Sequence, residues 1–270
     1  MIFMQITDFQ SKANARNENK IEWLAGIILG DGRVSDRYVR VYNNTPEIIE
    51  KSKETFLSEF GVSENKLKTR ILRKERNGYK RNVETIELCI NSTEFAKNFR
   101  RLIQKYIENP TASFVNGLFD AEGSVDLAGN ITLWQRKDNQ GTIVSETVKK
   151  FLNANDVRYK IINNPDFHII EIQGRYKYIQ NIIKFSEIIG FSVPHKQRDL
   201  ETILEIYSKK TRITEKEVLD FISRKGEGTM RDIIVTFGIP KINAYRILKT
   251  LVNKKKLTKT KSYPNIYKLC

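Results

Sequence analysis

Two acidic residues at matching positions of a repeated block are the best candidates for chemistry in this sequence. Asp31 lies in block 24–32 (LAGIILGDG) and Glu122 in block 115–123 (VNGLFDAEG), ninety-one positions further on. Each acid closes an apolar segment with helical spacing and is followed by glycine. A carboxylate at the C-terminal end of a helix is unfavourable there unless a cation is near. Two such carboxylates side by side would suit a hard divalent cation such as Mg²⁺, which takes oxygen ligands.

Small residues within the two blocks predict that the two acids meet. Gly26 and Gly30 lie one helical turn apart, and Gly117 and Ala121 repeat that spacing in the second block. Small residues on one helix face allow two helix backbones to approach closely. Either block alone would read as an ordinary buried helix, but two blocks with the same pattern at one offset are poorly explained in that way. We therefore expect the two helices to pack together with their C-terminal ends adjacent.

The elements around the blocks follow one order twice. In the first half the sequence predicts a helix at 19–30, two strands within 33–43, a helix from Pro46 to about 59, strands at 66–74 and 83–90 around a turn at 77–78, and a helix at 92–107. In the second half it predicts a helix at 111–121, a hairpin at 125–135, a helix at 143–152, strands at 158–162 and 167–172, and helices at 176–189 and 196–208.

The charge of the chain favours a polyanionic partner. Forty-seven Lys and Arg residues against thirty-two Asp and Glu residues give a net charge of +15. Residues 209–270 hold 16 basic and 5 acidic residues, so +11 of that charge lies there, and segment 66–81 adds eight basic residues and one acid. A basic surface can simply aid solubility, but clustering of this kind favours nucleic-acid binding.

Other features narrow the class of protein. The longest apolar run is short and interrupted by glycine, so no membrane-spanning helix is expected. The N-terminus has no secretion-signal pattern. Cys89 lies in a strand-like run and Cys270 is the last residue, which favours neither a disulfide framework nor a zinc site. We expect a cytoplasmic protein that acts without a membrane.

With its two blocks in this order, the chain resembles the LAGLIDADG homing endonucleases in their single-chain, two-repeat form. The resemblance covers residues 20–208 and implies an α+β fold of two pseudo-symmetric αββαββα repeats, 1–108 and 109–208, whose sheets form a DNA-binding saddle. Because the pseudo-dimer is internal, a monomer is expected.

The resemblance also implies roles for residues near the blocks. Asp31 and Glu122 would be the metal-binding acids, assisted by the carbonyls of Gly30 and Ala121, with Mg²⁺ or Mn²⁺ as the cofactor. The block position held by Asp120 in the second copy is Leu29 in the first, but it is not a metal-ligand position in the family.

Three further residues would surround the metal site. Gln135 matches the glutamine that the family places at the end of its second strand, and Asn43 is its shorter counterpart in the first half. Lys196 would be the family's lysine near the last helix. The difference between Asn43 and Gln135 predicts that the two halves are not equivalent.

A saddle requires strands with one apolar face and one polar or basic face. Alternating patterns at 66–71 and 157–161 fit that requirement. The candidate contacts to base edges and phosphates are Arg33, Arg37, Arg40, Lys66, Lys68, Arg70, Arg158 and Lys160.

Residues 209–270 predict a separate, smaller unit. After a linker at 209–212, three helices with a tight turn before the third and a basic hairpin resemble a winged helix-turn-helix. In the third helix, Ile242, Tyr245, Leu248 and Val252 are expected to face the core. The outward residues, Lys241, Asn243, Arg246 and Lys249, would then contact DNA.

The leading hypothesis is a site-specific homing endonuclease that hydrolyses both strands of DNA with a metal ion, giving a staggered cut across the minor groove. One alternative is a non-catalytic DNA-binding transcriptional regulator with a LAGLIDADG-like core; such proteins usually lack the acids, whereas Asp31 and Glu122 are both present. Another is an RNA maturase, whose partner would be intron RNA.

Overall fold

The structure, a computed structural model, describes residues 19–72, 75–76, 79–80, 84–174, 178–208, 212–260 and 264–270. The turn expected at 77–78 and most of the linker expected at 209–212 lie outside the described residues. Within the described residues, no helix combines the length and apolar character needed to cross a membrane.

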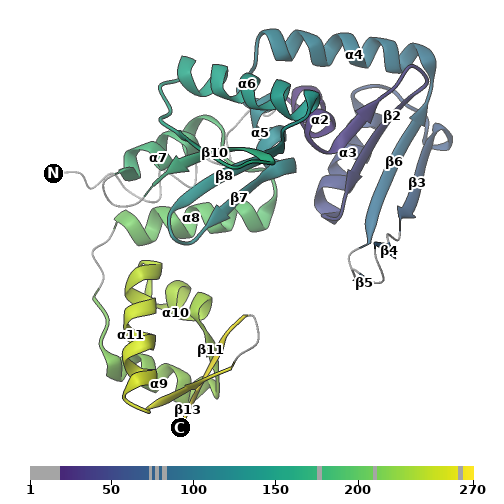
Figure 1. The fold of residues 1–270 in the computed structure, drawn as a ribbon. Coiled ribbons are helices and arrows are strands. Elements are labelled where there is room, and N and C mark those ends of the chain that lie inside the picture. The colour runs from purple at the N-terminus through teal and green to yellow at the C-terminus, as the bar shows by residue number, and fades with distance from the viewer. Residues whose placement is uncertain are drawn as a thin grey trace.

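The first half follows the predicted order of elements (Figure 1). Its principal elements are α2 (Lys20–Asp31), β1 (Gly32–Val34), β2 (Tyr38–Asn43), α3 (Pro46–Ser58), β3 (Leu67–Leu72), β6 (Thr85–Asn91) and α4 (Thr93–Glu108). A short 3-10 helix, η1 (Glu64–Lys66), precedes β3, and β4 (Glu75–Arg76) pairs with β5 (Tyr79–Lys80) between β3 and β6. The four main strands form an antiparallel sheet in the order β1-β2-β6-β3.

The second half repeats this arrangement and adds one helix. Its elements are α5 (Ala112–Glu122), β7 (Gly123–Asp126), β8 (Asn130–Arg136), α6 (Asn139–Ala154), β9 (Lys160–Ile162), β10 (Phe167–Gln173), α7 (Ile179–Ile188) and α8 (Pro194–Ser208). Its antiparallel sheet has the order β7-β8-β10-β9, which is the first sheet's order. The predicted α+β class and the twofold repetition of elements are therefore confirmed.

Local sequence signals explain where the two central helices begin. Asn19 caps α2, because its side-chain oxygen accepts hydrogen bonds from the backbone N–H groups of Ile21 and Glu22. Thr111 caps α5 in the same way through the N–H of Phe114. Both helices are buried along most of their length, and Figure 1 shows them between the two sheets. They form the centre of the core that joins the halves.

Each sheet packs one face against helices and leaves the other face open. On β2, Val39 and Val41 are fully buried in the core, whereas Arg40 and Tyr42 between them are only partly buried. On β8, Ile131 and Leu133 are buried and Trp134 is 43% exposed. Residues alternate between the faces because successive side chains of a strand point to opposite sides.

The C-terminal elements form a separate group below α8 in Figure 1. They are α9 (Glu215–Lys225), β11 (Gly228–Thr229), α10 (Met230–Phe237), α11 (Lys241–Asn253), β12 (Leu257–Lys259) and β13 (Ile266–Leu269). The three strands form a sheet in the order β11-β13-β12. Capping boxes begin α9 at Thr214 and α10 at Thr229, and Gly238 ends α10 in the left-handed conformation that glycine favours.

The predicted orientation of α11 is wrong for two of the four residues expected to face the core. Ile242 and Tyr245 are 54% and 47% exposed, and the buried residues of this helix are Ala244, Leu248 and Leu251. The sequence pattern of α11 admits two apolar stripes that share Leu248. Packing of α11 against α10 and the sheet selects the stripe through Ala244, which leaves Ile242 and Tyr245 at the surface.

Two strand predictions also need correction. Lys66 lies in η1 rather than in β3, and Arg158 precedes β9, which begins at Lys160. The expected apolar face is incomplete as well, because Ile71 and Ile161 are 59% and 53% exposed. Both residues lie on edge strands, β3 and β9, which have a neighbouring strand on one side only.

Candidate active site

Direct contact between two helix backbones brings the acids together. A Cβ atom placed on Gly26 would lie 2.1 Å from the carbonyl oxygen of Phe114, and one on Gly117 would lie 2.2 Å from that of Trp23. Near the end of the pair, a Cβ on Gly30 would lie 2.7 Å from Cβ of Ala121. Only glycine permits this approach of α2 and α5. The predicted packing through the small residues is what the structure shows.

Asp31 and Glu122 therefore end α2 and α5 beside each other. Their carboxyl groups are close enough for each to shift the pKa of the other. Burial raises the pKa of Asp31 from 3.8 to about 6. Burial and the adjacent Asp31 carboxylate raise the pKa of Glu122 from 4.5 to about 7. Two buried like charges oppose each other's ionisation, so the ionised pair favours a cation between its members.

An amide side chain from the neighbouring strand accompanies each acid. The Nδ2 group of Asn43, the last residue of β2, donates a hydrogen bond of 2.7 Å to Oδ2 of Asp31. Gln135 lies beside Glu122 and lowers the pKa of that carboxyl, although its buried Nε2 has no well-formed hydrogen bond. The structure thus places Gln135 and Asn43 at equivalent positions, and the shorter Asn43 makes the better-formed contact.

Two long side chains reach equivalent carbonyl oxygens at the ends of the central helices. Lys196 of α8 donates from Nζ to the carbonyls of Asp120 (2.6 Å) and Phe119 (3.2 Å). Gln140 of α6 donates from Nε2 to the carbonyl of Leu29 (2.6 Å). Leu29 and Asp120 occupy the same position in the two blocks. One half therefore receives an ammonium group at this place, and the other receives a neutral amide.

Lys196 contributes a positive charge that acts on both acids. Burial lowers the pKa of Lys196, and the charges of Asp120, Asp31 and Glu122 oppose that decrease. Its charge in turn lowers the pKa values of Asp31 and Glu122. The structure thus brings Lys196 to the site. It also adds Gln140, which sequence reasoning missed because Gln140 lies 111 residues from its partner and belongs to no repeated pattern.

Asp120 serves the architecture of the second half. Its buried carboxylate accepts hydrogen bonds from Nε1 of Trp23 (2.8 Å) and from the backbone N–H groups of Ser192 (3.0 Å) and Val193 (3.3 Å), just before α8. These bonds tie α5 to α2 and to the start of the helix that carries Lys196. The first half has no counterpart of α8, because α4 leads directly to α5. An acid at the position of Leu29 would therefore have no such helix start to bind.

The donor atoms fit a hard divalent cation that completes its ligand shell from other sources. Among the residues that the structure describes, no group of three or more His, Cys, Asp or Glu side chains could hold a metal ion. Mg²⁺ is commonly held by one or two carboxylates together with water and substrate phosphates. Asp31 and Glu122 would supply the two carboxylates. The additional roles of the Gly30 and Ala121 carbonyls remain predictions.

Comparison with known proteins gives a family match for one part of the chain, the part that carries Asp31. Residues 18–104 match the family model described as a LAGLIDADG-like domain. The chain contains a LAGLIDADG-like domain. No curated protein matches the chain.

Several solved structures resemble the fold. I-DmoI in complex with DNA and Mn is 19% identical, and the match covers 63% of this chain and 95% of that chain with a TM-score of 0.45. I-DmoI in complex with DNA and Ca is 18% identical, with 67% and 96% coverage and a TM-score of 0.49. Full-length DUF199/WhiA from Thermatoga maritima is 13% identical, with 91% and 95% coverage and a TM-score of 0.44.

Basic residues line the open face of the first sheet of the LAGLIDADG-like domain. Strand pairing places Arg33 opposite Arg40, and Lys68 and Arg70 opposite Cys89 and Glu87 of the central strand. Arg33, Lys68 and Arg70 are exposed. Arg37 lies in the turn between β1 and β2 and is also exposed. On the second sheet, Lys160 forms an ion pair with Glu171 at 2.8 Å.

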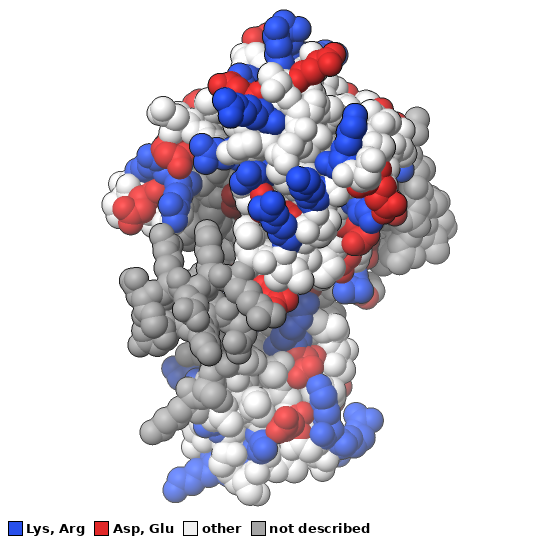
Figure 2. Space-filling view, turned by 90° about the vertical axis from the view of Figure 1, so that its right-hand side faces the viewer, with Lys and Arg blue, Asp and Glu red and all other residues white. Residues whose placement is uncertain are grey.

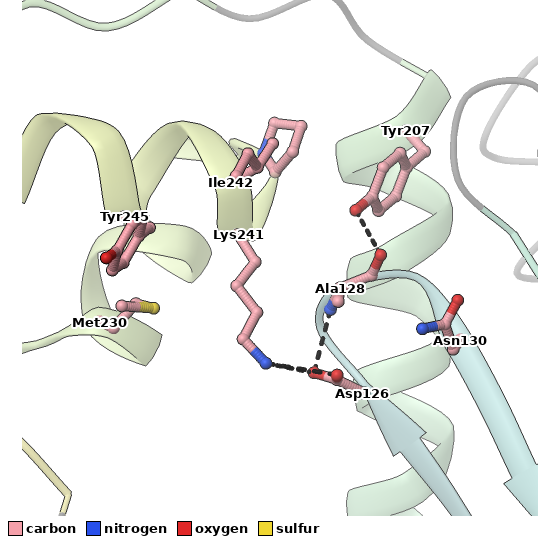
Figure 3. A pocket seen from close by; sticks show the side chains of 9 residues that line it. Asp126, Ala128, Asn130, Tyr207, Met230, Lys241, Ile242 and Tyr245 are labelled. Atoms are coloured by element: carbon pink, nitrogen blue, oxygen red, sulfur yellow. Dashed lines mark hydrogen bonds and ion pairs between the residues drawn. The ribbon is translucent and has the colours of Figure 1, made fainter.

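The C-terminal candidates occupy different environments. Arg246 and Lys249 are exposed on α11, and Asn243 is partly buried. The side chain of Lys241 is 45% exposed, and its Nζ forms an ion pair with Asp126 of β7 at 3.0 Å (Figure 3). This pair spans a cleft of about 540 Å³, lined by Asp126, Ala128, Asn130, Tyr207, Met230, Pro240, Lys241, Ile242 and Tyr245. On the side of the molecule that Figure 2 shows, basic side chains are spread over the upper and the lower part of the molecule, with acidic side chains between them.

The raised pKa of Glu122, beside Asp31, predicts that the stability of the chain depends on pH. The pKa of Glu122 is raised from 4.5 to about 7 in the folded chain, so folding favours the protonated carboxyl group. The stability that this group contributes is fully present below pH 4.5 and is lost as the pH rises through about 7. The Glu122→Gln variant carries a neutral amide at this position, which does not ionise as the pH rises. In metal-free buffer its melting temperature should exceed that of the wild type by several degrees near pH 8, and by little near pH 5. A difference that does not change with pH in a thermal-shift series contradicts this prediction.

Proposed function

We propose that this protein is a divalent-metal-dependent endonuclease that cuts both strands of duplex DNA at a specific site. The observation that carries the proposal is the pairing of Asp31 and Glu122, one from each half, at the ends of α2 and α5. Burial raises the pKa of both carboxyl groups, and the charge of Asp31 raises that of Glu122 further, so a cation would favour the ionised pair. Two acids from pseudo-symmetric halves suit two cleavages, one in each strand.

Asp31 and Glu122 would hold the cation. When bound, a divalent metal supplies neutralisation of the negative charge that develops on the phosphodiester during hydrolysis. The carboxylates and amides are positioned before any substrate arrives, since Asn43 already orients Asp31 through a 2.7 Å hydrogen bond. The need for further ligands agrees with a substrate that brings its own phosphate oxygens.

Lys196 would stabilise charge on the phosphate side of the reaction. Its ammonium group is held by two carbonyl oxygens of α5 and lies close enough to both acids to alter their pKa values. In the equivalent place of the first half, the amide of Gln140 carries no charge. We therefore propose that the two strands are cut at unequal rates. We also propose that the cut is staggered across the minor groove.

The test uses the full chain with Mg²⁺ or Mn²⁺ and a supercoiled plasmid library carrying random inserts. We expect linear products with a defined sequence at their ends, preceded by nicked circles because the two halves differ. Selective, tight binding to duplex DNA without cleavage under either metal contradicts the nuclease. That result would establish a non-catalytic DNA-binding protein instead.

A second proposal concerns the division of the chain and its C-terminal part. We propose three units: the two LAGLIDADG repeats, 1–108 and 109–208, and a winged helix-turn-helix, 209–270, that binds the same DNA. Three helices, the turn at Gly238 before α11, and the sheet of β11, β13 and β12 support this interpretation. With the corrected orientation, the exposed face of α11 carries Tyr245, Arg246 and Lys249.

This proposal predicts a change in the salt dependence of DNA binding. The double variant Arg246→Gln/Lys249→Gln should bind duplex DNA more weakly at low salt. The slope of log K against log[salt] should flatten by about 0.9 for each phosphate that the variant no longer neutralises. Lys216→Gln, at an exposed position on α9, is the control for the loss of one positive charge outside α11, and its slope should stay close to that of the wild type. Equal slopes for the double variant and the wild type, measured by fluorescence anisotropy, contradict a role for α11.

A further inference from the structure

A buried acid lies on the open face of the first sheet, away from the metal site. Glu87, on the central strand β6, is only 3% exposed. Its Oε1 atom lies 3.0 Å from Nε of Arg40 on the neighbouring strand β2. Neither residue faces the helices, because the core side chains of these strands, Val39, Val41 and Leu88, lie on the alternate positions. The pair thus belongs to the surface that the proposed function assigns to DNA.

Three side chains, including that of Glu87, contact the guanidinium group of Arg40. Nη1 of Arg40 donates to the hydroxyl of Tyr42 at 3.3 Å, and its guanidinium carbon lies 3.9 Å from the ring centre of Tyr38. The guanidinium is therefore surrounded by an acid, a hydroxyl and an aromatic ring, although Nε of Arg40 and Oε1 of Glu87 form an ion pair without an aligned hydrogen bond. An arginine has five N–H donors in a rigid fork, so these contacts leave further donors of the fork for a partner. The Arg40 side chain remains 30% exposed.

Stability alone explains this arrangement poorly. Taking a carboxylate out of water is costly, and an ion pair with a buried member often contributes no more to stability than apolar residues of the same size. An acid on a DNA-binding face also repels phosphates. A gain in binding specificity can offset the desolvation of the acid and its repulsion of phosphates, if the acid orients an arginine toward base edges instead of the DNA backbone. An arginine held in one orientation also loses less side-chain entropy on binding.

We propose that Arg40 reads a guanine in the major groove and that Glu87 is the residue that positions it. A planar arginine can donate two hydrogen bonds to O6 and N7 of guanine, which is the commonest specific contact in this groove. The inference rests on the proposed DNA binding. The neighbouring Lys68 and Arg70 are exposed and lack a comparable buried partner among the described contacts, so they are assigned to phosphates.

The second sheet provides an internal comparison. Lys160 pairs with the buried Glu171 at 2.8 Å, and Glu171 also accepts from Nε2 of Gln173 at 3.2 Å. A lysine is a point charge without the planar fork of arginine. We therefore expect less discrimination between bases at Lys160 than at Arg40.

The test is selection from a randomised duplex DNA library by the full chain, without divalent metal, followed by affinity measurements on every single-base variant of the selected site. The wild type should show a guanine preference that Arg40→Gln and Arg40→Lys reduce by about tenfold or more at one position. Glu87→Gln should reduce the preference at that same position while keeping most of the affinity. Lys68→Gln, the control, should weaken binding to all variants of the site alike.

Arg40→Lys keeps the charge and Glu87→Gln keeps the shape of the side chain, so both variants should fold, which circular dichroism can check. Unchanged base preferences in both variants contradict the inference while leaving the proposed DNA binding intact. A uniform loss of affinity at all positions in Arg40→Lys also contradicts it, because that loss identifies a phosphate contact. A wild-type chain that binds no duplex DNA refutes the proposed function, and this inference with it.

Discussion

Asp31→Asn and Glu122→Gln should each abolish double-strand cleavage while leaving DNA binding intact. Each substitution removes one of the two carboxylates that meet at the ends of α2 and α5 and are proposed to hold the metal. Loss of such a ligand should lower the cleavage rate by more than about 100-fold, since changes to residues that merely support a metal ligand already cost 10–100-fold. Binding should be retained or strengthened, because negative charge is removed from a surface that faces phosphates.

The two variants are compared with Glu146→Gln, an exposed acid on α6 outside the site. Cleavage is followed on a plasmid carrying the selected target, with nicked and linear products separated on a gel. Thermal-shift titration with Mn²⁺ gives a second readout, in which the metal should stabilise the wild type and the Glu146→Gln variant but not the double variant of Asp31 and Glu122. Cleavage at the wild-type rate by either single variant contradicts the assignment of the acids.

Gly117→Ala should destabilise the chain by about 3 kcal/mol or more, although alanine is the better helix former by about 1 kcal/mol. The added Cβ would lie 2.2 Å from the carbonyl oxygen of Trp23 and 3.0 Å from the backbone nitrogen of Ile27. These atoms belong to a helix backbone, which can yield only if α2 and α5 move apart. Separation of these helices would also separate Asp31 from Glu122, so activity should fall with stability.

Urea unfolding in metal-free buffer measures the effect, with Asn98→Ala, exposed on α4, as the control that should remain within about 0.5 kcal/mol of the wild type. Gly30→Ala should lie between the two, because its Cβ would meet the methyl group of Ala121 instead of backbone atoms. A Gly117→Ala variant as stable as the wild type would mean that the helices are not in backbone contact.

Sequence patterns predicted best those features that depend on local chemistry. The caps at Asn19 and Thr111 and the alternation along β2 follow from neighbouring residues, and most element types are confirmed. The α11 register is wrong because two apolar stripes satisfied the same helical pattern, and only packing chose between them. Lys66 and Arg158 fall outside their strands because strand ends depend on pairing partners, which the local sequence does not reveal.

Residue spacing alone is enough to predict that two acids end two similar helices and that small residues allow those helices to touch. That information is local and repeated, so spacing alone carries it. Asn43, Gln135 and Lys196 are expected near the acids only through the family resemblance, and packing sets the contacts that they and Gln140 make. Gln140, Lys196 and the Arg40–Glu87 pair reach their positions through contacts between residues far apart in the chain. Such contacts depend on how helices and sheets pack, and no spacing in the sequence encodes them.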